Sequence, residues 1–78
     1  MKESQIQKKK IKQLEEEGYF VVKLVLTNKM GIPDLLALKD GKALFLEVKR
    51  PNTKLTKLQE YRIQELKKQG FDTEVYKG

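Results

Sequence analysis

Two apolar stretches near the middle of the chain, 35–38 and 43–46, flank the dipeptide Asp40-Gly41. Apolar runs joined through Asp-Gly predict a β-hairpin, because a type I′ turn needs φ > 0 at both of its central residues. Both strands are apolar on both faces, so we expect them in the centre of a sheet. The turn also fixes the register, which gives three facing pairs: Lys39 with Lys42, Leu38 with Ala43, and Leu36 with Phe45.

Acidic residues face each other where this hairpin opens. Continuing the register places Asp34 opposite Glu47, and such neighbours have Cβ atoms roughly 4.5–5.5 Å apart. Lys49 lies two residues beyond Glu47 and therefore shares its face. Like charges at this distance are destabilising, and a divalent cation such as Mg²⁺, which binds carboxylate oxygens, is the simplest relief. The alternative is a surface strand end at which Lys49 neutralises one acid.

The segment before the hairpin predicts a helix and a strand. The helix covers Glu3–Glu17 and ends at Gly18, while β-branched and aromatic residues predict a strand over Tyr19–Thr27. Glu3 falls on the apolar side of the helix, where it is either a charge that stabilises the helix dipole or a third ligand aimed into the site. That apolar side is formed by Ile6, Ile11 and Leu14.

The segment after the hairpin predicts a second helix over Lys57–Gln69 and a short strand over Phe71–Tyr76. Thr56 and Gln59 fit a capping box at the start of this helix. Gln59 therefore has two interpretations: a helix cap, or a hydrogen bond to a substrate phosphate or to a catalytic lysine. The resulting α-β-β-β-α-β order predicts an α/β fold with a mixed sheet whose central hairpin is covered by helices.

Composition narrows the chemistry that the chain can perform. The 78 residues predict a single domain, 1–78, and include no cysteine and no histidine, which excludes zinc–thiolate sites and histidine catalysis. The 17 basic against 11 acidic residues give a net charge of +6, a balance typical of nucleic-acid-binding proteins. The sequence lacks a signal peptide and a membrane-spanning apolar run, so we expect a cytosolic protein. A domain this small is marginally stable alone, which favours self-association.

With these residues identified, the chain resembles the virus-type replication-repair nuclease (VRR-NUC) domain, a branch of the PD-(D/E)xK superfamily, in its stand-alone phage-type version. This resemblance implies a restriction-endonuclease-like core and, for a phage-encoded protein, the cytoplasm of a bacterial host. The matching positions extend over nearly the whole chain: Glu3, Gly31-Ile32-Pro33-Asp34, Glu47-Val48-Lys49 and Thr56-Lys57-Leu58-Gln59.

The resemblance implies metal-dependent hydrolysis of DNA phosphodiesters. Asp34, Glu47 and the carbonyl of Val48 would then hold Mg²⁺ or Mn²⁺, joined by Glu3 directly or through water. Lys49 would orient or activate the attacking water, and Gln59 would complete the catalytic set. The ion polarises the phosphate and lowers the pKa of bound water.

The remaining basic residues would bind the DNA backbone without reading sequence. Since no element looks like a base-reading helix, we expect selectivity for branched or junction DNA, and by analogy a two-fold homodimer. Two alternatives stay open: a non-catalytic nucleic-acid-binding module with the same fold, and a small protein-binding adaptor. The expected phosphate contacts are Lys8, Lys9, Lys10, Arg50, Lys54 and Lys57.

Overall fold

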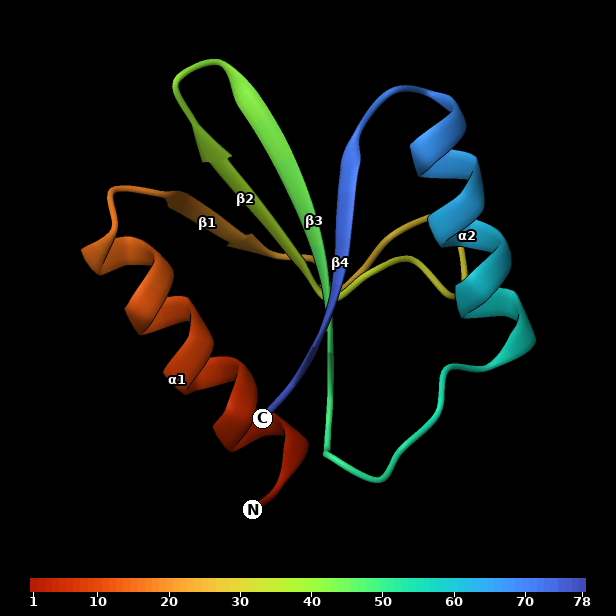
Figure 1. Cartoon of the computed structure of the whole chain (residues 1–78), viewed down its shortest axis with the longest axis horizontal. Coiled ribbons are helices and arrows are strands. Elements are labelled where there is room, and N and C mark those ends of the chain that lie inside the picture. Colours follow the sequence, from red (N-terminus) through yellow and green to blue (C-terminus); the bar gives the residue numbers. More distant parts are fainter.

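The computed structural model describes residues 1–78 and confirms the predicted order of elements around a four-stranded mixed sheet (Figure 1). The strand order is β1-β2-β3-β4; β1, β2 and β3 are antiparallel neighbours, and β4 runs parallel to β3 after the crossover through α2. Neither helix has the length and apolar character needed to cross a membrane. The elements are α1 Glu3–Glu16, β1 Phe20–Lys23, β2 Leu35–Lys39, β3 Lys42–Lys49, α2 Lys57–Lys68 and β4 Asp72–Lys77.

The central hairpin has the predicted turn and register. Asp40 and Gly41 have φ values of 52° and 76°, as a type I′ turn requires. The hairpin strands β2 and β3 occupy the two central positions of the sheet, as their double-sided apolar pattern predicted. All three predicted pairs are present: Lys39 with Lys42, Leu38 with Ala43, and Leu36 with Phe45.

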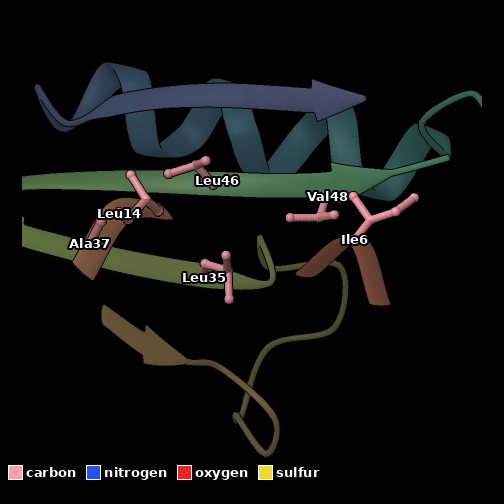
Figure 2. Close-up of a cluster of buried hydrophobic side chains, with 6 residues drawn as sticks. All are labelled: Ile6, Leu14, Leu35, Ala37, Leu46 and Val48. Atoms are coloured by element: carbon pink, nitrogen blue, oxygen red, sulfur yellow. The ribbon is translucent and has the colours of Figure 1, made fainter. Parts of the chain in front are cut away.

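The hydrophobic core lies between α1 and one face of the hairpin. Ile6 and Leu14 of α1 pack against side chains that alternate along β2 and β3, while α2 lies on the far side of the sheet (Figure 2). Because successive strand residues point to opposite faces, every residue between these core positions points toward the α2 side. The core positions on the strands are Leu35, Ala37, Leu46 and Val48.

The strand predicted over Tyr19–Thr27 is wrong in its second half. β1 ends at Lys23, which pairs with Leu35, the first residue of β2. Pro33 has no N–H and interrupts the ladder two residues before Leu35. One further hydrogen bond joins Leu24 N to the Asp34 carbonyl (2.8 Å). Beyond Leu24 the first strand therefore has no partner strand. Residues 24–34, hereafter the β1–β2 loop, therefore leave the sheet despite their apolar composition.

The β1–β2 loop is attached to α2. The Nε–H of Arg62 donates to the Met30 carbonyl at 2.9 Å, and Gly31 lies against the side chain of Leu58. Figure 1 shows the loop reaching across to α2 before it returns to β2. Because the loop ends at Asp34, this attachment determines how the chain approaches the start of β2.

Gly31 is expected to tolerate a side chain poorly. Its φ of +78° is strained for other residues, and an added Cβ would lie 2.7 Å from Cγ of Leu58 and 3.3 Å from that residue's carbonyl carbon. Gly31→Ala should therefore lower the free energy of unfolding by about 2–3 kcal/mol in urea titrations. Gly70→Ala is the matched control, because Gly70 has a φ of +90° with no atom within 4 Å, and should cost about 1 kcal/mol. Equal losses would show that the Leu58 contact is not restrictive.

Candidate active site

The two predicted acidic side chains lie on the same side of the sheet. Asp34 immediately precedes β2, and the observed pairing of Leu35 with Leu46 continues to Asp34 and Glu47. Both acids, and Lys49, alternate with core residues and so point away from α1. The Asp34 carboxyl lies close enough to Glu47 to raise its pKa, both through its charge and as a hydrogen-bond partner of the protonated acid.

Asp34 is held by a backbone contact that sequence reasoning missed. Its Oδ2 accepts a hydrogen bond from Val48 N at 2.9 Å. In the continued register Val48 faces Pro33, so the carboxylate takes the place of a ladder partner where the ladder breaks. An extended residue directs its N–H and C=O to the same side, which turns the Val48 carbonyl toward Asp34 as well. The Pro-Asp dipeptide at a strand start was the available signal.

Glu47 is a buried acid with an unusual pKa. Its side chain is only 1% exposed, and Oε1 is buried without any hydrogen-bond partner. Burial, the hydrogen bond to Asp34 and the charge of Asp34, in that order, raise its pKa from 4.5 to about 8. Lys49 acts in the opposite direction, and Glu3 adds the smallest increase. Without a cation, Glu47 is therefore mainly neutral at pH 7, and the shared proton relieves the repulsion.

Lys49 is buried over most of its length and forms no ion pair, although its charge acts on Glu47. It is 7% exposed, yet the single ion pair of the protein joins Arg62 to Glu65 at 2.7 Å. The ammonium of Lys49 is therefore available to an anion or a water molecule supplied from outside the chain.

These groups fit a hard divalent cation. Mg²⁺ and Mn²⁺ bind carboxylate and carbonyl oxygens together with water. The site offers two neighbouring carboxylates, one of them with an unpartnered buried oxygen, and the carbonyl of Val48. Of the three predicted carboxylates the structure brings only two close together, and no three acidic side chains gather into one cluster. The role of Glu3, on the first turn of α1, stays a prediction.

Gln59 forms the predicted helix cap. Its Oε1 accepts from Thr56 N at 2.9 Å, and its own N–H donates to Thr56 Oγ1 at 3.1 Å. The capping interpretation is confirmed. A catalytic role stays a prediction and is confined to the side-chain NH₂, because the amide oxygen is already occupied.

The predicted DNA-contacting residues form two groups. Arg50, Lys54 and Lys57 are exposed and follow Lys49 along the chain into the start of α2. Lys8 and Lys9 are exposed on α1, which covers the opposite face of the sheet. Lys10 differs from these, because its ammonium lies 4.4 Å from the centre of the Tyr76 ring and 3.3 Å from Gln13 Oε1.

Comparisons with known proteins agree with this geometry. The family model of the VRR-NUC domain matches residues 23–78, a range that includes Asp34, Glu47 and Lys49. A solved structure described as a VRR_NUC domain superimposes with a TM-score of 0.87 at 33% identity, covering 97% of this chain and 84% of that chain. No curated protein sequence matches the chain. With the family match extending over the paired acids and the buried lysine, and the whole fold superimposing on a solved member, the chain belongs to the VRR-NUC family of nucleases.

Proposed function

We propose that this nuclease domain hydrolyses DNA phosphodiesters with the help of Mg²⁺ or Mn²⁺ and prefers branched or junction DNA. The observation that supports metal dependence best is the unpartnered, buried Oε1 of Glu47 beside Asp34. An acid buried against another acid is expensive, and such an arrangement is common where a function requires it.

The chain's own groups have separate tasks in this proposal. Asp34 and Glu47, with the Val48 carbonyl, hold the cation, and the hydrogen bond from Val48 N fixes the Asp34 carboxylate in place. The cation, when bound, polarises the scissile phosphate and lowers the pKa of its water. Glu3 on α1 would join these ligands, directly or through water.

Lys49 and Gln59 act on the substrate. The ammonium of Lys49 orients the attacking water and stabilises the negative charge that develops on the phosphorus oxygens. Because it forms no ion pair within the protein, it needs no rearrangement to take this role. The side-chain NH₂ of Gln59 donates a hydrogen bond to the phosphate or to the water held by Lys49.

Selectivity for branched DNA follows from what the basic surface can and cannot do. Exposed basic side chains beside the site contact phosphates in any sequence, and no element of the chain looks like a base-reading helix. A two-fold homodimer would present two such sites to the two strands of a junction. The phosphate contacts beside the site are assigned to Arg50, Lys54 and Lys57, and contacts away from it, through α1, to Lys8, Lys9 and Lys10.

A non-catalytic DNA-binding module is the second candidate, and one observation favours it. The pKa of Glu47 is raised to about 8, so a shared proton relieves the repulsion with Asp34 even without a cation. In this alternative the acidic pair is a neutral hydrogen-bonded unit and the basic surface alone accounts for DNA binding.

Cleavage assays separate the two candidates. Wild-type protein is incubated with a four-way junction, and with a linear duplex of the same sequence, in Mg²⁺, in Mn²⁺ or in EDTA. We expect nicks only with a divalent ion, and roughly tenfold faster cleavage of the junction. Binding without nicking would favour the binding module. Equal rates on both DNAs would overturn the preference for branched substrates, and nicking that persists in EDTA would overturn metal dependence.

A further inference from the structure

The β1–β2 loop carries large apolar side chains that nothing in the protein covers. Leu26 is 97% exposed, and Val25 and Met30 are each 77% exposed. Single exposed apolar residues are common, but several on one short loop mark an interaction site. This loop was predicted as a strand because of these residues, and leaving the sheet gives them no partner inside the fold.

The loop presents these side chains from a fixed frame. A hydrogen bond from Leu24 N to the Asp34 carbonyl (2.8 Å) closes its base, and Thr27 Oγ1 donates to the Lys29 carbonyl (2.9 Å) at its tip. The returning arm is held by the bond from Arg62 to Met30. The backbone is thus tied at three places, while the apolar side chains project outward.

The same closure places the loop beside the candidate metal site. Leu26 is two residues from Leu24, so its Cα lies within about 7 Å of the Leu24 Cα, and Leu24 hydrogen-bonds directly to Asp34. A DNA strand whose phosphate reaches Asp34 and Glu47 therefore passes the tip of the loop within a few nucleotides.

Charge favours DNA over a second protein copy as the occupant of this surface. From Gly18 through Pro33 the chain contains Lys23 and Lys29 and no acidic residue, and the whole protein carries +6. In a two-fold dimer that forms through this loop, the lysines of one subunit would approach the same lysines of the other subunit, and their charges would repel. DNA offers phosphates to the lysines and base faces to the apolar side chains.

We propose that Leu26, with Met30 of the same loop, is a wedge that inserts between bases at the branch point of the DNA substrate. Apolar side chains commonly separate base steps in this way, and bases at a branch are already partly unstacked, which lowers the cost of insertion. The wedge would make DNA with a branch a better substrate than a continuous duplex. This inference rests on the proposed nuclease function and specifies how its substrate is chosen.

The test uses wild-type protein with Mg²⁺ and a four-way junction that carries 2-aminopurine next to the branch. Fluorescence should rise before cleavage in the first turnover, because insertion unstacks the reporter base. Leu26→Ser should abolish this rise and lower the ratio of junction to duplex cleavage about tenfold, while Leu26→Met should keep both. Phe20→Ser is the matched control, since Phe20 is 69% exposed but lies on β1 outside the loop.

Several outcomes overturn the wedge. An unchanged cleavage ratio in Leu26→Ser, or a wild-type complex without a fluorescence rise, removes it while leaving the nuclease function intact. A dimer that dissociates in Leu26→Ser, measured by sedimentation without DNA, would make the loop a protein interface instead. A wild-type protein that cleaves neither DNA contradicts the proposed function itself, and the wedge with it.

Discussion

Glu47→Gln should lower the rate of DNA cleavage by about a thousandfold or more. The substitution keeps the size of the side chain but removes one of the two carboxylates that would hold the cation, and losses of this size follow when charge stabilisation at a reacting phosphate is removed. Single-turnover cleavage of a junction with Mg²⁺ measures the effect. Mn²⁺ binding, followed by titration calorimetry, should be lost in parallel.

The same substitution should stabilise the metal-free protein at alkaline pH. Glu47 is an acid whose pKa is raised from 4.5 in the unfolded chain to about 8 in the folded one, so between these pH values the folded state holds a proton that the unfolded state has lost. Stability of the wild type in EDTA therefore falls as pH rises from about 4.5 to 8. Glutamine does not titrate, so Glu47→Gln should lack this fall.

Urea unfolding in EDTA at pH 5 and pH 8 measures this difference. Glu74→Gln is the matched control, because Glu74 is an exposed acid on the neighbouring strand and should change neither pH dependence nor cleavage. Mg²⁺ should stabilise the wild type at pH 8 through preferential binding to the folded state, and should leave Glu47→Gln unchanged. Parallel pH profiles for wild type and Glu47→Gln would contradict the buried acid as the cause.

The hairpin and its register followed from the sequence because two independent signals agreed. Asp40-Gly41 specifies the turn, and the apolar runs on both sides specify central strands. With side chains alternating every residue, a one-residue error would have moved Glu47 to the α1 core. The proximity of Asp34 and Glu47 was therefore predictable without knowledge of any other element.

Features that depend on contacts between distant elements were not predictable. The end of β1 is set by Pro33 on its partner strand, whereas the local composition of residues 24–27 favours a strand. Arg62 and Leu58 hold the β1–β2 loop from 32 and 27 residues away along the chain, and neither shows a local signal for this contact. The shared proton between the acids also depends on how deeply Glu47 is buried, which the sequence does not specify.

Lys49→Met should separate catalysis from metal binding. The substitution keeps the apolar stem of the side chain and removes the ammonium that would orient the water and stabilise the phosphate charge, so cleavage should fall about a thousandfold. Mn²⁺ should bind as tightly as to the wild type or more tightly, because a positive charge near Glu47 is gone. Glu47→Gln should lose both cleavage and Mn²⁺ binding. The two variants therefore distinguish a lysine that positions the water from a carboxylate that binds the metal ion.

The fold supplies a closely matched control for this variant. Lys77 pairs with Lys49 across the parallel strands β3 and β4 but is exposed, so Lys77→Met makes the same change in net charge beside the site. It should weaken DNA binding slightly through the lost charge and leave the cleavage step unchanged. Lys49→Met should in addition keep or raise the melting temperature, because methionine retains the apolar stem of this 7% exposed residue and removes a charge that forms no ion pair. A lower melting temperature, or wild-type cleavage in Lys49→Met, would assign Lys49 to the structure of the sheet and leave the cation and its acids to act without it.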